Sequence, residues 1–162
     1  MNMIPVASGI MPNAREGGRR IDLGHKLGEG EYEFIELKLG NNCQPPLRAA
    51  IEILEYGLIY LFSRQNLCAL GYDPANALLQ ATRIHLKVLA PAVSYIAGSL
   101  KIFEHAVNDG LTKMIAEEDL SVFMDFYFEM FPAGLTWGEN AIGALEAMKM
   151  RRLVYDHGSI DG

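Results

Sequence analysis

The hydrophobic period of the chain changes repeatedly, and this limits the folds open to it more than any other feature. Residues 31–39 alternate every second position, as a strand does, and residues 47–63 show the i, i+3, i+4, i+7 spacing of a helix that faces a core. The two-residue period returns at 83–89 and at 120–131. Strands that alternate with helices in this way predict a sheet with helices packed on its faces.

A tight hairpin is expected at the start of this pattern. Residues 20–25 form a short strand candidate, and Gly28-Glu29-Gly30 supply the reversal, because glycine accepts the positive φ that such turns demand. A second helix is expected from about residue 93, with 108–110 as a candidate break, and a capping-box spacing predicts a terminal helix over 136–152. The predicted order is therefore β-β-α-β-α-β-α.

We expect a single α/β domain, a mixed β-sheet flanked by α-helices, over residues 20–162. Residues 1–19 contain several glycines and prolines without a sustained period, so they are expected to be irregular. A chain of 162 residues is long enough for one domain with its own core. On the helix over 47–63 the expected core-facing residues are Leu47, Ala50, Ile51, Leu54, Leu58 and Leu61.

Composition narrows the choice of partners and compartment. The formal net charge of −6 argues against a strong non-specific binder of duplex nucleic acid, although Arg15, Arg19, Arg20 and Arg48 could form a local basic patch. No apolar run approaches the ~20 residues of a membrane span, and the two cysteines provide no disulfide framework. We expect a cytoplasmic protein that does not bind membranes. Whether it forms a homo-oligomer is left open by the sequence.

Three residues carry candidate chemistry: Asp22, Glu36 and Lys38. The hairpin would place Asp22 beside Glu36, and two converging carboxylates make an oxygen-rich site suited to Mg²⁺ or Mn²⁺, with the Leu37 carbonyl as a further ligand. Lys38 projects to the same side as Glu36, where its ammonium could orient an activated water or stabilise charge on a phosphoryl oxygen.

Asp22, the Glu36-Leu37-Lys38 run and the helix that begins near Pro46 together resemble the core of the PD-(D/E)XK nuclease superfamily. The resemblance implies a restriction-endonuclease-like fold and Mg²⁺- or Mn²⁺-dependent phosphodiester hydrolysis on nucleic acid. It implies that Asp22 and Glu36 hold the metal, while Lys38 assists the attacking water.

The resemblance extends loosely into the first helix. The exonuclease branch of the superfamily carries a glutamine there with a tyrosine four residues later, and Glu52 and Tyr56 stand at that spacing; Glu55 is an equal candidate. Two departures are visible. Ile21, not proline, precedes Asp22, and residues 1–19 offer no helix before the first strand.

Other interpretations of the same residues stay open. Glu36 and Lys38 could be a surface ion pair on a strand end. The chain could be a protein-binding or assembly module on the same fold, or a phosphodiesterase for a small molecule, and the acidic balance suits both. His85 and His105 are expected to be surface histidines, and the helix dipole accounts for the cations at 149–152.

Overall fold

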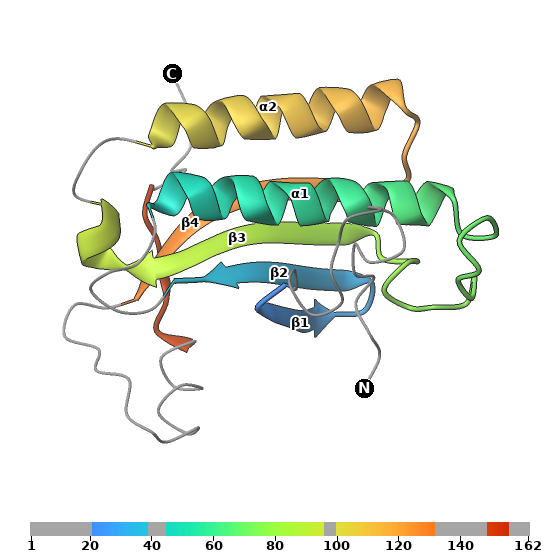
Figure 1. Cartoon of the computed structure of the whole chain (residues 1–162), viewed down its shortest axis with the longest axis horizontal. Helices are drawn as coiled ribbons and strands as arrows, with labels where there is room; N and C mark the ends of the chain where they lie inside the picture. Colours follow the sequence, from blue (N-terminus) through green and yellow to red (C-terminus); the bar gives the residue numbers. More distant parts are fainter. Residues whose placement is uncertain (1–20, 39–44, 96–99, 132–148, 156–162) are drawn as a thin grey trace.

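Five strands form one mixed sheet in the order β1-β2-β3-β4-β5, and two α-helices pack on it (Figure 1). The computed structural model describes residues 21–38, 45–95, 100–131 and 149–155. The elements are β1 (Leu23–Gly28), β2 (Glu31–Leu37), α1 (Pro46–Gln65), β3 (Arg83–Pro91), the 3₁₀ helix η2 (Ala92–Tyr95), α2 (Lys101–Glu117), β4 (Phe123–Phe131) and β5 (Arg152–Leu153). The predicted mixed α/β domain is confirmed at this level.

The two helices cover one face of the sheet. Strands β2, β3 and β4 run parallel to one another, while β1 and β5 are antiparallel to their neighbours at the two edges. Both crossovers step in the same direction along the sheet, and right-handed crossovers of this kind place their helices on the same side, as Figure 1 shows. The prediction of helices packed on the sheet is therefore met on one face among the described residues.

The hairpin forms where it was expected, but its first strand is shifted. The turn lies at Glu29 and Gly30, and Gly30 has a φ of +68°. A residue with a side chain would be strained in this backbone conformation. The Gly30 carbonyl also accepts the N–H of Thr82 at 2.8 Å, which ties the turn to the start of β3. Because β1 begins at Leu23, Asp22 lies in a bend just before the strand instead of within it.

Strand β2 divides its side chains between two environments, as the alternation predicted. Phe34 faces the helices and joins the main core with Tyr32 packed against it, whereas Ile35 lies on the other face with Leu37 against it. Both Phe34 and Ile35 are almost fully buried. Strand β2 is therefore covered on both sides, so its polar residues must find partners inside the protein.

Helix α1 is rotated relative to the predicted stripe. Ala50 and Leu61 are buried as expected, but Leu47, Ile51 and Leu58 are exposed. The cause is Gly57, where an added Cβ would lie 2.5 Å from the Leu86 side chain. The helix backbone lies close to β3 at this glycine, so small and aromatic residues, together with Ile53, face the sheet. They are Ala49, Ala50, Ile53, Tyr56, Gly57 and Tyr60.

The second helical region also differs from the prediction. Val93 lies in η2 and is 61% exposed, and α2 begins at Lys101. Residues 108–110 do not break the helix, because the Asn108 side chain bonds the backbone of β4. Its amide donates to the Phe126 carbonyl at 2.9 Å and accepts the Phe126 N–H at 2.8 Å. Asn108 thus fastens α2 to the edge of β4.

Strands β3 and β4 supply the centre of the core. The two-residue period of β3 predicts that Ile84, Leu86 and Val88 face inward, and all three are fully buried, as are Met124, Phe126 and Phe128 of β4. The predicted terminal helix lies largely outside the described residues, and its end is wrong, because Arg152 belongs to β5 and pairs with Met130. Neither of the long helices that the structure describes has the length and hydropathy to span a bilayer.

Candidate active site

The hairpin brings Asp22 to the C-terminal end of β2. The register pairs Leu23 with Ile35, so the next position outward sets Asp22 opposite Glu36. The Leu37 N–H donates to Asp22 Oδ2 at 2.8 Å, which fixes the carboxylate beside the strand end. The predicted approach of Asp22 to Glu36 is therefore present in the structure.

Glu36 and Lys38 do point the same way, and a third carboxylate joins them from α1. Lys38 Nζ donates to Glu36 Oε1 at 2.6 Å and to Glu52 Oε2 at 3.0 Å. Arg48 lies 3.5 Å from Glu52 along the helix. Glu52, one of the two glutamates proposed on this helix, contacts Lys38 directly. Asp22, Glu36, Lys38 and Glu52 are called the acidic cluster below.

Negative charge outweighs positive charge in the acidic cluster, and the titration of Glu36 reflects it. The pKa of Glu36 is raised to about 7, because burial raises it most, the carboxylates of Asp22 and Glu52 add to the rise, and the Lys38 ammonium opposes it. Burial alone would lower the pKa of Lys38, but its hydrogen bonds to Glu36 and Glu52 raise it, so it stays an ammonium at neutral pH.

The donor set of the acidic cluster suits a hard divalent cation only in part. Carboxylate oxygens are the ligands that Mg²⁺ and Mn²⁺ prefer, and Asp22 and Glu36 supply them from adjacent strand ends. Among the residues that the structure describes, however, no group of three or more His, Cys, Asp or Glu side chains is arranged to hold a metal ion. Two carboxylates would leave most of the coordination shell to water and substrate.

A hollow of about 470 Å³ opens next to Asp22, between β1, β2 and the loop before β3. Tyr32, Phe34 and Lys26 are among the residues that line it. The Lys26 ammonium lies 5.9 Å from the centre of the Tyr32 ring. The hollow therefore joins apolar walls to one carboxylate and one ammonium.

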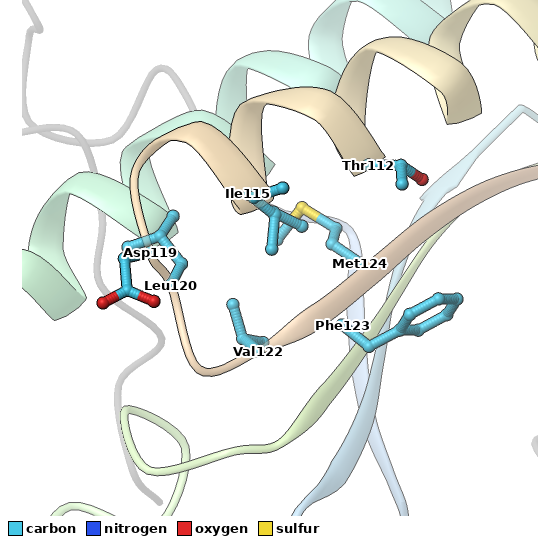
Figure 2. A pocket seen from close by; sticks show the side chains of 8 residues that line it. Thr112, Ile115, Asp119, Leu120, Val122, Phe123 and Met124 are labelled. Carbon is cyan, nitrogen blue, oxygen red and sulfur yellow. The ribbon is translucent and has the colours of Figure 1, made fainter.

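A second hollow, of about 310 Å³, lies between the end of α2 and the start of β4 (Figure 2). Ile115, Leu120, Val122 and Met124 line it, and Asp119 stands at its edge with a φ of +48°. None of the proposed site residues lines it. It offers apolar packing without a set of groups for acid–base or metal chemistry.

The face of the sheet opposite the helices holds a second charged cluster, which sequence reasoning missed. Glu33 is fully buried and its carboxylate contacts Lys87 at 2.9 Å, Arg151 at 2.8 Å and His25 at 2.9 Å. Lys87 reaches on to Glu129 at 2.8 Å. Arg151 was attributed to the end of a helix, but here it is bound to carboxylates of β2 and β4. These five residues are called the buried ion network below.

His85 lies on the same face and is bound on both sides. Its Nδ1 is 2.6 Å from Asp125 and its Nε2 is 3.0 Å from Glu31, and its side chain is only 12% exposed. The hydrogen bond to Asp125 raises the pKa of His85. The expectation of a surface histidine is wrong for His85, whereas His105 is exposed as predicted.

A signal for these contacts was present in the sequence. Glu31 and Glu33 alternate on β2, His85 and Lys87 on β3, and Asp125 and Glu129 on β4. Parallel pairing sets the cationic strand β3 between two acidic ones. Recognising this required the strand order, which no single strand reveals.

Comparison of the chain with models of known protein families, with curated proteins and with solved structures finds no match. The resemblance to the PD-(D/E)XK superfamily therefore depends on the residues of the acidic cluster and the order of the elements around it.

Proposed function

We propose that the chain is a PD-(D/E)XK-like enzyme of restriction-endonuclease-like fold that hydrolyses phosphodiester bonds in nucleic acid with Mg²⁺ or Mn²⁺. The observation that carries the proposal is the convergence of Asp22, Glu36 and Lys38 at one strand end. The antiparallel hairpin, the helix after it and the parallel strand β3 follow in the order expected of that superfamily.

Each side chain of the acidic cluster has a role in this proposal. Asp22 and Glu36 would hold the cation, which supplies Lewis-acid activation of water and of the phosphoryl group when bound. Lys38 would stabilise charge that builds on a phosphoryl oxygen, because its ammonium remains protonated at neutral pH. Glu52 would hold Lys38 in place through its 3.0 Å contact.

The hollow beside Asp22 suggests where the substrate would extend. A phosphodiester at Asp22 and Glu36 would have its next nucleotide toward the hollow, where the partly exposed Tyr32 ring forms part of the lining. An exposed aromatic ring favours unpaired bases, because stacking needs an open face of the base. A net charge of −6 also disfavours a long duplex track, so single-stranded nucleic acid is the substrate that fits best.

The test is cleavage of single- and double-stranded DNA and RNA in Mg²⁺ or Mn²⁺, with a chelator as the blank. Asp22→Asn and Glu36→Gln should each abolish cleavage and the Mn²⁺ heat in calorimetry. Glu29→Gln, at an exposed turn of the same hairpin, should alter neither. Unchanged Mn²⁺ affinity in both site variants would refute the metal site.

One observation favours a second function. Lys38 is within hydrogen-bond distance of both Glu36 and Glu52, so it partly neutralises Glu36, one of the two carboxylates that a metal would need. In a protein-binding module on the same fold, such a contact would serve only to stabilise the structure. Wild-type protein without metal-dependent cleavage of any nucleic acid or cyclic nucleotide, together with no Mn²⁺ heat, would favour this module.

A further inference from the structure

Helix α1 exposes a line of large apolar side chains along its outer surface. Leu47 is 41% exposed, Ile51 52%, Leu58 49% and Phe62 46%, and Leu54 between them is half-buried. These five residues are called the α1 strip. Four large side chains, each about half exposed, give an apolar area on the order of 400 Å², a size at which exposed patches often mark interaction sites.

The spacing of the α1 strip is that of a helix–helix seam. Successive residues are separated by four, three, four and four positions, so Leu47, Ile51, Leu54 and Leu58 follow the alternating three- and four-residue steps of a heptad seam. A helix that packs only on a sheet needs one apolar face, which α1 already supplies through Ala50, Ile53 and Tyr60. The α1 strip is a second apolar face on the same helix.

The four exposed residues are also spaced symmetrically. The steps between Leu47, Ile51, Leu58 and Phe62 are four, seven and four, and read the same from either end. In a two-fold interface each contact occurs twice, so a symmetric spacing lets one helix match a second copy of itself in the antiparallel direction. Leu47 would then meet Phe62 of the other copy, and Ile51 would meet its Leu58.

We propose that the α1 strip is the interface of a homodimer in which α1 packs antiparallel against α1 of a second copy. A single helix pair buries less area than most stable complexes, so the dimer is weak and depends on concentration.

The first test is the molar mass by sedimentation velocity from about 10 µM to about 1 mM, a range that brackets weak association. Wild type should shift from monomer toward dimer. Ile51→Asp and Leu58→Asp should remain monomeric, while Ile102→Asp should behave as wild type, because Ile102 is 80% exposed on α2 and outside the α1 strip. A wild type that is monomeric throughout would overturn the proposal.

A measurement of the fold guards against a misfolded variant as the cause of dissociation. Far-ultraviolet circular dichroism of Ile51→Asp and Leu58→Asp should match that of the wild type, because both side chains are about half exposed. Folded variants that dimerise as the wild type does would contradict the proposal.

Cross-linking tests the direction of the helices. With the two native cysteines replaced by serine, a mixture of Ile51→Cys and Leu58→Cys chains should form a mixed disulfide dimer, and each chain alone should form little. Dimers that link only like positions would show a parallel pair and overturn the antiparallel proposal.

Discussion

Glu33 and Glu36 lie three residues apart on β2, on opposite faces of the sheet. The protein shifts their pKa values in opposite directions. Both are buried, with 0% and 6% of their surface exposed. Burial alone would raise the pKa of Glu33, but contacts with Lys87, His25 and Arg151 lower it. The pKa of Glu36 rises to about 7, because burial is reinforced by Asp22 and Glu52 and opposed by Lys38.

The contrast separates a structural charge from a candidate functional one. Around Glu33 the cations match the carboxylates, so the ionised form is stabilised and the buried ion network holds β2, β3, β4 and Arg151 together. In the acidic cluster Glu36 and Glu52 share Lys38, and the Asp22 carboxylate also acts on Glu36, so ionising Glu36 is costly. An uncompensated negative site is expected where a protein binds a cation, and it is an inefficient way to stabilise a fold.

The largest expected effect is on the buried ion network. Glu33→Gln should destabilise the protein by roughly 3–5 kcal/mol, because Lys87 and Arg151 would lose a buried carboxylate. Urea unfolding of the variant and of Glu31→Gln, a partly exposed neighbour on the same strand face, measures the difference. A loss below about 1 kcal/mol, the range of surface ion pairs, would mean that Glu33 is not the centre of a structural network.

The next largest effects are expected from substituting one lysine in each cluster. Lys38→Met should leave folding intact and reduce the cleavage rate by ~10²-fold or more, since it removes one stabiliser of developing charge. Lys87→Met should instead lower stability, because it leaves Glu33 and Glu129 underpaired. The measurements are single-turnover cleavage and thermal unfolding of both variants. If Lys38→Met changed stability alone, the ion-pair interpretation of Lys38 would replace the catalytic one.

Local patterns in the sequence predicted much of the fold. Alternation identified β2, β3 and the inward residues of β4, and the glycines at 28 and 30 identified the hairpin. Glu36 lies on β2 and Lys38 follows it directly, while the hairpin turn brings Asp22 to the same strand end, so the site could be anticipated from one strand and one turn. Such features depend on neighbours in sequence, which the chain itself displays.

What could not be predicted depends on contacts between distant segments. The rotation of α1 follows from the meeting of Gly57 with Leu86 on β3. The buried ion network needs Glu33, Lys87 and Arg151 from three separate segments. Apolar periodicity could not reveal the rotation, because leucines and alanines fit the same helical pattern. It could not reveal the buried ion network either, because charged residues are expected to face solvent.

The third expected effect concerns His85 and pH. Because the folded pKa of His85 is raised by Asp125 and Glu31, its contribution is complete below the unfolded value of about 6.5 and is lost as pH rises through the folded value. His85→Gln should therefore cost roughly 2 kcal/mol at about pH 6, from lost charged hydrogen bonds, and less at about pH 9. Unfolding curves across this range, with His105→Gln as the exposed control, measure it; a cost independent of pH would contradict the charged form.

The smallest expected effect tests the acidic cluster without any assay of activity. The folded pKa of Glu36 is raised from 4.5 to about 7, so between these values the folded state binds its proton more tightly than the unfolded state. The free energy of unfolding of the wild type should therefore fall as pH rises through this window. Glu36→Gln removes that loss, so the variant should gain on the wild type as pH rises across the window.

Thermal unfolding of Glu36→Gln, wild type and Glu29→Gln in metal-free buffer between about pH 5 and about pH 8 measures this gain. The Glu29→Gln control should track the wild type, because its side chain is exposed at the turn. A Glu36→Gln variant that is least stable relative to the wild type at the upper pH would show that the pair with Lys38 stabilises the fold. Glu36 would then resemble Glu33, and the uncompensated charge that supports a metal site would be absent.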